Sequence, residues 1–404
     1  MKIAVLTHTF PRNNQDSTAA FMKEFCDGLS ENRNEVIVVT PYDSKFNRKK
    51  DPFKIVTYKY IWPYKLQMLG YSRTMEADQL LKKRAYFLIP FMVFFGTFKL
   101  VSVIRKYKID IINAHWIFPN GFIAMLASIF TRTPYTITIP GTDAYLAYRY
   151  KLLGAVAKII SFKASVVFSN SSFNLKRILN LGARPKYKAV ISYPVDIFKF
   201  KPLNLDLSVI RERHGIKKGE IVILAVGRMV YKKGYDYLIK AMKNFKKNNV
   251  KLLLAGEGDL KMQWMDLTRE LELEEKILFI GNIKRDEIVK YYNLADICVA
   301  PSIIDKQGNV DGGPVTNFES MACGRPQVAT DVLSIADIIE NGVNGFVIPQ
   351  KNVKSLELAL SKLIKSKILR NKMGVLNRRK ILKEVTTKSI GEKYTDFFLR
   401  ALSI

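Results

Sequence analysis

The sequence predicts an α/β protein with two doubly wound parallel sheets. Short β-branched runs alternate with helical stretches, and this alternation restarts near residue 220. The 404 residues also exceed the size at which a single hydrophobic core stops growing. Continuous apolar strands separated by amphipathic helices are typical of parallel sheets with helices on both faces. The composition, 48% hydrophobic and 25% charged, is that of a globular chain.

In the first half, six apolar runs are expected to form buried parallel strands. They are Lys2–Thr7, Glu35–Thr40, Ile109–Asn113, Tyr135–Ile139, Ser165–Ser169 and Ala189–Ser192. Helices are expected between them, at residues 17–31, 85–107, 119–131, 152–162 and 172–181. This order predicts one sheet covered by helices.

In the second half, five further strands are expected. They are Glu220–Gly227, Val250–Ala255, Lys276–Ile280, Asp296–Ala300 and Gln327–Thr330. The polar, proline-bearing segment Phe198–Lys218 precedes them, and the chain reads as helical after Val353. We therefore expect an N-terminal Rossmann-like domain over residues 1–200 and a C-terminal one over 201–385. A final helix over 386–404, with the apolar stripe Tyr394, Phe397 and Phe398, is expected to pack back on the N-terminal domain.

The net charge of +29 favours phosphate-rich partners. Residues 45–108 hold 15 lysines and arginines and three acids, together with aromatic residues such as Trp62 and the apolar run Ala85–Phe98. Basic and aromatic residues beside an apolar helix favour a site that binds an anionic membrane over one that binds nucleic acid. The chain has no recognisable nucleic-acid-binding motif. The run is too short to span a bilayer. The alternative is a lysine-rich surface whose charges are merely solvated.

The cysteines and the N-terminus indicate a reducing compartment. Cys26, Cys298 and Cys323 lie far apart, in no metal-ligand spacing, and each has apolar neighbours. Buried thiols are therefore expected, and no metal site. The first residues lead directly into an apolar strand without the pattern of a signal peptide, which predicts a cytoplasmic protein.

Residues 227–234, G-R-M-V-Y-K-K-G, carry the strongest local signal. They follow a strand and precede a helix expected to open at Tyr235. Gly227 allows a tight turn, and the N-terminus of a helix offers free amides and partial positive charge. Arg228 and Lys233 add cations that suit a phosphate. The pattern indicates a cradle for a diphosphate; the alternative is a solvated basic turn.

Residues 311–326 carry the second signal. A glycine-rich loop after Asp311 leads into a short helix that contains Glu319 and ends at Gly324. Carboxylates accept hydrogen bonds from vicinal hydroxyls, so the two acids are expected to bind the hydroxyls of a ribose and a sugar. The alternative for Glu319, an acid on a helix surface, fits poorly with its neighbours Phe318, Met321 and Ala322.

Six blocks in order resemble the retaining family-four glycosyltransferases of the GT-B fold. They are G-R-M-V-Y-K-K-G (227–234), A-G-E-G-D (255–259), F-I-G-N-I (279–283), A-D-I-C-V-A-P-S (295–302), G-G-P-V-T-N-F-E-S-M-A-C-G-R-P (312–326) and N-G-V-N-G-F-V-I-P (341–349). A-H-W-I-F-P-N-G (114–121) and P-V-D-I-F-K-F-K-P (194–202) are similar to weaker motifs of the same family. The resemblance implies two Rossmann-like domains that face each other across a cleft.

The resemblance also implies roles for individual residues. Arg228 and Lys233 would bind the donor diphosphate, Asp311 would contact the transferred sugar, and Glu319 would hold the ribose hydroxyls. The remaining donor-binding positions would be Gly227, Gly281, Gly312, Gly313, Pro314, Val315 and Thr316. The family works without a metal or a cofactor, and its donor substrate is a nucleoside-diphosphate sugar.

Several positions depart from the family pattern. Asp311 replaces the usual glutamate, Pro140 replaces a histidine in T-I-P-G-T-D (138–143), and Asp16-Ser17 stands where a Gly-Gly loop is usual. On the acceptor side we expect His8, Ser17, His115, Pro140 and Asp143. For His8 and His115, a purely structural role is the alternative.

The sequence thus predicts a retaining, metal-independent transferase that moves a hexose-type unit from a nucleotide sugar to a glycan, glycolipid or lipid-linked acceptor. Polysaccharide or glycolipid assembly at the inner face of the cell membrane is the expected setting. The alternative is a catalytically silent GT-B subunit that binds a partner or a nucleotide, which Pro140 and Asp311 favour.

Overall fold

The chain forms two compact units. The computed structural model describes all residues apart from 15, 17, 49, 71–74, 77–79, 82, 307, 311–314, 333–337 and 404. One unit combines Met1–Pro194 with Thr386–Ile404, and the other spans Val195–Val385. The boundary between the units thus lies at Pro194–Val195, whereas the sequence predicted it after residue 200. Val195 and Phe200 are buried in the core of the second unit, and the Val195 N–H donates to the Val385 carbonyl at 2.9 Å.

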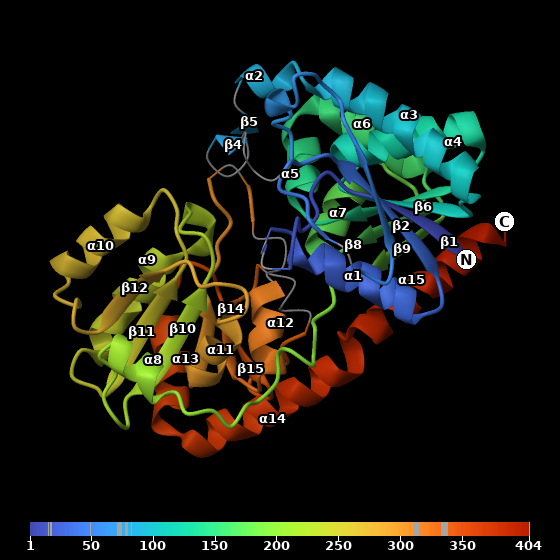
Figure 1. Ribbon diagram of the computed structural model, residues 1–404. Helices are drawn as coiled ribbons and strands as arrows, with labels where there is room; N and C mark the ends of the chain where they lie inside the picture. The colour runs from blue at the N-terminus through green and yellow to red at the C-terminus, as the bar shows by residue number, and fades with distance from the viewer. Residues whose placement is uncertain are drawn as a thin grey trace. The chain divides into compact units, whose positions relative to one another are not determined.

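The first unit contains a parallel seven-stranded sheet in the order β3-β2-β1-β6-β7-β8-β9 (Figure 1). Its strands are β1 (Lys2–Leu6), β2 (Glu35–Pro41), β3 (Lys54–Tyr58), β6 (Ile111–His115), β7 (Tyr135–Ile139), β8 (Val166–Ser169) and β9 (Tyr187–Val190). The edge strand β3 was not among the strands expected from the sequence. Only Tyr58 of this strand is fully buried, so the strand lacks the continuous apolar pattern of its central neighbours.

Helices cover both faces of this sheet (Figure 1). They are α1 (Ala20–Glu31), α2 (Lys83–Tyr86), α3 (Ile89–Tyr107), α4 (Phe122–Thr131), α5 (Thr142–Arg149), α6 (Lys151–Lys163), α7 (Ser172–Asn180) and α15 (Thr387–Leu402). Short elements complete the unit: η1 (Tyr64–Leu66), η2 (Ile117–Gly121), β4 (Met75–Glu76) and β5 (Leu80–Leu81). Buried residues of α3, α4 and α6, including Leu100, Ile123 and Ile160, join the core on one face of the sheet.

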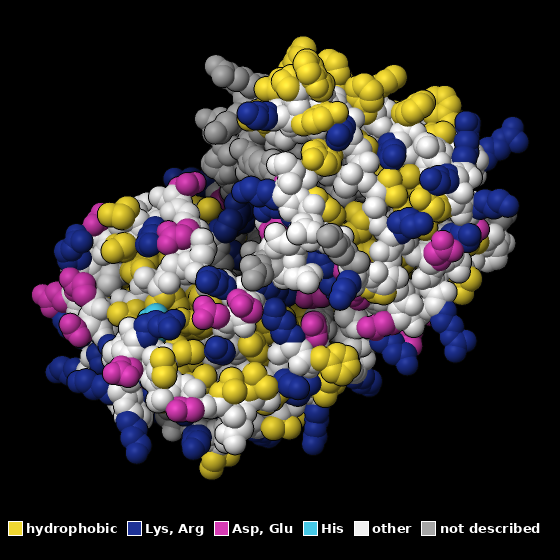
Figure 2. Space-filling model, in the orientation of Figure 1, with side chains coloured by type: hydrophobic (Ala, Val, Ile, Leu, Met, Phe, Trp, Pro, Cys, Tyr) yellow, Lys and Arg dark blue, Asp and Glu magenta, His cyan; other side chains and the backbone are white. Residues whose placement is uncertain are grey.

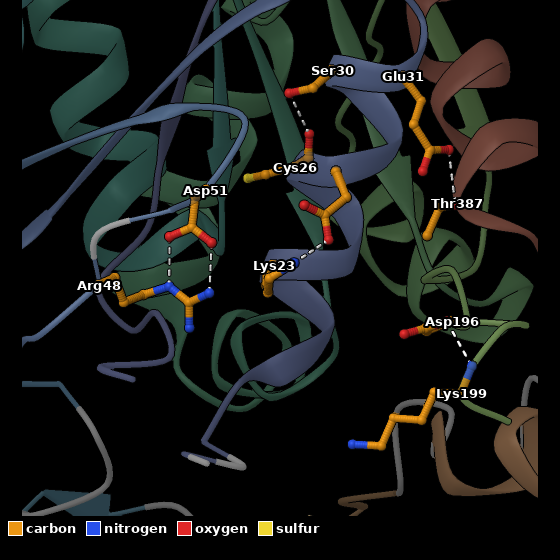
Figure 3. A network of polar contacts seen from close by, with 10 residues as sticks. Lys23, Cys26, Ser30, Glu31, Arg48, Asp51, Asp196, Lys199 and Thr387 are labelled. Carbon is orange, nitrogen blue, oxygen red and sulfur yellow. Dashed lines mark hydrogen bonds and ion pairs between the residues drawn. The ribbon is translucent and has the colours of Figure 1, made fainter. Parts of the chain in front are cut away.

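The C-terminal helix α15 packs against α1 of the first unit, as the sequence predicted. Gly28 and Gly391 permit the close approach, since a Cβ on Gly391 would lie 2.1 Å from the Gly28 carbonyl oxygen. Figure 3 shows the Thr387 hydroxyl donating to Glu31 Oε2, at 2.9 Å. Tyr394 and Phe398 are fully buried, so the apolar stripe of α15 completes the core on this face.

The second unit contains a parallel six-stranded sheet in the order β12-β11-β10-β13-β14-β15 (Figure 1). Its strands are β10 (Ile221–Val226), β11 (Val250–Ala255), β12 (Ile277–Gly281), β13 (Ile297–Ala300), β14 (Gln327–Thr330) and β15 (Gly345–Ile348). Strand β15, also at an edge of its sheet, was not among the strands expected from the sequence, and it is only four residues long. Because all strands are parallel, their carboxyl ends share one edge, where ligands bind in such folds.

Helices on both faces complete the second unit. They are α8 (Ser208–Arg213), η3 (Tyr231–Lys233), α9 (Tyr235–Met242), η4 (Lys243–Phe245), α10 (Lys261–Glu270), α11 (Ile288–Leu294), α12 (Val315–Ala322), α13 (Val353–Lys365) and α14 (Lys367–Glu384). Cys298 and Cys323 are buried here, and Cys26 is buried in the first unit. Among the described residues, no helix has both the length and the apolar character that crossing a membrane requires.

Candidate active site

The turn after β10 holds the two predicted phosphate-binding cations. Arg228 is exposed, and Lys233 is half-buried in η3, immediately before α9. Gly234 ends η3 with φ +63°. A Cβ there would also lie 2.2 Å from the Pro301 carbonyl oxygen. A glycine is therefore required for the turn to pass so close to the loop after β13.

Lys233 folds back over Gly227. A Cβ added at Gly227 would lie 3.0 Å from Lys233 Nζ and 3.1 Å from the Tyr235 hydroxyl. The missing side chain at Gly227 thus leaves the room in which the ammonium group lies. This arrangement brings the cation next to Gly227 at the carboxyl end of β10, a geometry that suits an anionic ligand.

Backbone hydrogen bonds join the loops that follow β10, β11 and β12. Gly227 N–H donates to Ala255 O at 2.9 Å, Met229 N–H to Glu257 O at 2.8 Å, and Gly256 N–H to Gly281 O at 2.8 Å. Gly256 has φ +137°, and a Cβ there would lie 2.0 Å from the Gly227 carbonyl oxygen. The predicted donor-binding residues Gly227 and Gly281 therefore belong to one connected set of loops.

Glu319, on α12, is buried and engaged at both carboxylate oxygens. Arg285 forms an ion pair with Oε1, and the Tyr292 hydroxyl donates to Oε2 at 2.9 Å. Burial and the neighbouring carboxylate raise the pKa of Tyr292 well above its usual value, so the phenol stays protonated as a donor. Each carboxylate oxygen has a second lone pair, which leaves Glu319 able to accept a further hydrogen bond.

The first turn of α12 holds polar groups that lack partners in the described part of the chain. These are the buried Thr316 Oγ1 and Asn317 Nδ2. A buried polar group without a hydrogen bond is costly, so both atoms are suited to meet a ligand. Val315 begins the same helix and is half-buried. The predicted residues Asp311, Gly312, Gly313 and Pro314 lie outside the described residues.

In the first unit, Asn120 links the two histidines at the carboxyl edge of the sheet. Its amide donates to the His115 carbonyl at 2.7 Å and to His8 Nδ1 at 3.0 Å. His115 Nδ1 and the Tyr193 hydroxyl share a hydrogen bond of 3.0 Å. Burial lowers the pKa of His8 to about 4 and, together with His8, lowers the pKa of His115 to about 3. Both imidazoles are therefore neutral near pH 7.

Asp143 caps the turn after β7. Its carboxylate accepts the Ile117 N–H at 2.7 Å and the Gly141 N–H at 3.2 Å. Burial raises its pKa to about 6, although these amides act in the opposite direction. Pro140 is half-buried, and its carbonyl accepts from Asn170 at 2.9 Å. Asp143 therefore holds the backbone of this turn in place, and Pro140 presents no side-chain donor.

The loop after β1 is fixed by Asp16. Its carboxylate accepts from Arg12 Nε at 2.5 Å and from the Thr18 N–H at 3.0 Å. Burial opposes ionisation, but these bonds outweigh it and hold the pKa of Asp16 well below its usual range. Ser17, which the sequence placed on the acceptor side, lies outside the described residues.

Four residues of these two sites were not among the site residues expected from the sequence. Arg285 and Tyr292 engage Glu319, while Asn120 and Tyr193 hold His8 and His115. Asn120 lies inside the recognised block 114–121, so its position was available as a signal. The other three lie outside the recognised blocks, and only the fold brings them to their partners.

Comparisons with known proteins agree with this architecture. A family model described as glycosyl transferases group 1 matches residues 208–380, and one described as glycosyltransferase family 4 matches residues 18–197. An uncharacterised glycosyltransferase of Methanocaldococcus jannaschii is 25% identical over 90% of this chain and 89% of its own length. A capsular polysaccharide biosynthesis glycosyltransferase of Staphylococcus aureus is 25% identical over 74% of this chain and 79% of its own.

A solved structure gives the same result for the fold. The Anabaena protein HepE, crystallised with UDP, aligns with a TM-score of 0.75 and 18% sequence identity. The alignment covers 99% of this chain and 100% of that one. The two family models divide between the two sheets described above, and together they cover most of the chain. The chain therefore belongs to the family-four, group 1 glycosyltransferases and has the GT-B fold.

Proposed function

We propose that this glycosyltransferase is retaining and metal-independent, and that it moves a sugar from a nucleoside-diphosphate sugar to a polysaccharide, glycolipid or lipid-linked acceptor. The carrying observation is the glycine turn at the end of β10, where the exposed Arg228 and the ammonium group of Lys233 lie beside Gly227. Two cations stabilise the negative charge that develops on a departing diphosphate. In this proposal no bound metal is needed to neutralise that charge.

The reaction is a substitution at the anomeric carbon of the donor sugar. The bond from that carbon to the phosphate oxygen breaks, and its electron pair leaves with the nucleoside diphosphate. The acceptor hydroxyl forms the new bond from the same face, and its proton passes to the departing phosphate oxygen. Arg228 and Lys233 stabilise the diphosphate, most strongly in the transition state.

The remaining donor contacts are assigned to the loops around this turn. Thr316 at the start of α12 would add a hydrogen bond to the donor, and its unpartnered hydroxyl favours this role. Glu319 would accept from the ribose hydroxyls while Arg285 and Tyr292 hold its carboxylate in place. Backbone near Gly281 would face the base, and Asp311 would contact the transferred sugar.

The first unit would bind the acceptor. His8 and His115 are neutral near pH 7, which suits hydrogen bonds to sugar hydroxyls. The capsular polysaccharide relative of Staphylococcus aureus favours a glycan product, and UDP in the HepE complex favours a nucleotide donor. We place the enzyme peripherally at the inner face of the cell membrane, with residues 45–108 toward the lipid.

The test is turnover by the purified chain. Nucleoside-diphosphate release is measured with UDP-, GDP- and ADP-sugars, lipid extract as the acceptor source, and EDTA throughout. One donor should be consumed, EDTA should leave the rate unchanged, and NMR of the product should show the anomeric configuration of the donor. An inverted product, or activity restored only by added Mg²⁺ or Mn²⁺, would contradict the proposal.

A catalytically silent subunit is the second candidate. Pro140 favours it, because a proline offers no side-chain hydrogen bond where the resembling family has a histidine. Such a subunit would be stabilised by a nucleotide but would transfer no sugar from any donor in the panel. Replacing Pro140 with histidine discriminates further, since a gain of turnover in the Pro140→His variant would favour the silent subunit.

A further inference from the structure

Three neighbouring helices of the first unit leave an apolar face uncovered. Helices α3, α4 and α6 contact one another in sequence across one face of the sheet, and their inner residues join the core. Their outer residues include large apolar side chains that solvent reaches. These are Phe91, Phe94, Phe95 and Phe98 on α3, Ile129 and Phe130 on α4, and Leu152, Ile159 and Phe162 on α6. We call this set the α3–α4–α6 face.

The exposure of this face is large. Phe94, Phe98 and Phe130 are 67%, 71% and 65% exposed, and Phe87, just before α3, is 72% exposed. Phe87, Phe91, Phe94 and Phe98 recur at the spacing of one helix face. Figure 2 shows hydrophobic side chains gathered over the part of the first unit where Figure 1 places α3 and α4. Gathered apolar side chains of this kind mark an interaction surface.

The charges on these helices point to the chemistry of the partner. Together α3, α4 and α6 contain no aspartate and no glutamate. They carry the cations Lys99, Arg105, Lys106, Lys151, Lys158 and Lys163. Helix α1, on the other face of the same sheet, carries Glu24, Asp27 and Glu31. Cations and exposed aromatics on one surface complement an anionic bilayer, which offers negative headgroups above an apolar layer.

We infer that the α3–α4–α6 face inserts its aromatic side chains into the interface of an anionic membrane. This inference deepens the proposed membrane setting and rests on it. The anchoring surface then extends beyond residues 45–108 to α4 and α6, which follow that segment in the chain. Apolar insertion supplies the part of the affinity that persists at high salt, and the lysines and arginines supply the part that salt removes.

Vesicle sedimentation tests the inference. The full chain is mixed with phosphatidylcholine vesicles and with phosphatidylcholine–phosphatidylglycerol vesicles, at low salt and at 0.5 M NaCl, about the ionic strength at which exposed charges are strongly screened. We expect binding to the anionic vesicles, with a measurable fraction retained at high salt. The Phe94→Ser/Phe98→Ser variant should bind roughly tenfold more weakly at both salt concentrations.

Matched variants separate the two contributions. Lys158→Glu/Lys163→Glu should bind the anionic vesicles more weakly at low salt and keep the residual binding at high salt. Ile368→Ser, at an 83% exposed position on α14 of the second unit, should bind as the wild type does. Thermal unfolding of each variant checks that the fold is retained.

Three results would overturn the inference. The first is that the wild-type chain does not bind anionic vesicles. The second is that the Phe94→Ser/Phe98→Ser variant binds them as strongly as the wild type. The third is that the wild-type chain self-associates in solution and the same variant does not. The last result would assign the face to a second copy of the chain. Sugar transfer is measured in parallel with a detergent-solubilised acceptor. Transfer without vesicle binding would contradict only this inference, whereas vesicle binding without transfer would contradict the proposed function.

Discussion

The carboxyl edges of the two sheets carry different polar chemistry. In the second unit, cations dominate: Arg228 and Lys233 flank the turn after β10, and Arg285 pairs with the buried Glu319. In the first unit, His8 and His115 are neutral near pH 7. Its buried acid, Asp143, is held by backbone amides, and no lysine or arginine among the described residues pairs with it.

This difference matches the two halves of the proposed reaction. A nucleotide sugar carries its charge on the diphosphate, which requires cations, whereas an acceptor presents hydroxyls, which neutral donors and acceptors bind. The cations that we assign to the donor diphosphate therefore lie in the second unit. The variants below change one edge at a time, in order of decreasing expected effect.

The largest effect is expected from Arg285→Met, which leaves the buried Glu319 carboxylate without its cation. The side chains of the pair are 14% and 3% exposed, so the free energy of unfolding should fall by about 3–5 kcal/mol. Chemical denaturation measures the loss. Arg269→Met is the control, because Arg269 pairs with Asp266 at 65% and 63% exposure, and its loss should stay below about 1 kcal/mol. Equal losses in the two variants would mean that the buried pair has no special role in stability.

Arg228→Ala and Lys233→Ala should each lower kcat/KM by about 100- to 1000-fold, or roughly 2–4 kcal/mol of transition-state stabilisation. The fold should remain intact, since neither side chain is buried. Steady-state kinetics with the preferred donor measures the effect. Lys247→Ala, an exposed lysine just before β11 at the opposite edge of the sheet, should behave as wild type. Near-normal kinetics in both Arg228→Ala and Lys233→Ala would mean that the diphosphate binds elsewhere.

Acid should destabilise the first unit through its histidines. His8 and His115 have folded pKa values of about 4 and about 3, below the ordinary 6.5, so only the unfolded chain gains their protons between pH 6.5 and 4. Asp143 acts in the opposite direction. Its folded pKa of about 6 exceeds 3.8, and its contribution to stability is lost as pH rises through 6. The two histidines should prevail, with a net loss of roughly 2–4 kcal/mol between pH 7 and pH 4.

Thermal unfolding between pH 4 and 7 follows this effect. His8→Asn should flatten the slope, because it removes one of the two groups that resist protonation in the folded state. Asp143→Asn should steepen it, because it removes the opposing contribution. A melting temperature that does not change over this range in the wild type would show that the histidines titrate normally.

The smallest effect is expected from Glu319→Gln. The amide keeps the shape of the side chain but accepts hydrogen bonds less strongly than a carboxylate, so nucleotide affinity should fall by about tenfold, near 1.4 kcal/mol. Tyr292→Phe is the control, since it removes only the internal hydrogen bond to Glu319. Calorimetric titration gives both dissociation constants. Unchanged affinity in Glu319→Gln would remove the ribose from its proposed partners.

The sequence anticipated the second unit better than the first. Residues 227–234 form one contiguous turn, so their pattern of glycines and cations could be recognised without knowledge of the fold. In the first unit, the contact between His8 and Asn120 joins residues 112 positions apart, and that between His115 and Tyr193 joins residues 78 apart. Such contacts depend on the order of the strands in the sheet, which the sequence pattern alone does not give. The edge strand β3 was missed because its half-exposed run lacks a continuous apolar signal.

The measurement that tests the cradle most directly is nucleotide-dependent thermal stabilisation of the wild type and of Arg228→Ala/Lys233→Ala. UDP, GDP and ADP are compared with their nucleosides in the presence of EDTA. One diphosphate should raise the melting temperature of the wild type. At a concentration 100 times its Kd, it should increase the free energy of unfolding by about 2.7 kcal/mol. Its nucleoside should have a much smaller effect, and the double variant should lose the response. Wild type that responds to no diphosphate, or a double variant that responds as strongly as wild type, would contradict a diphosphate site at this turn.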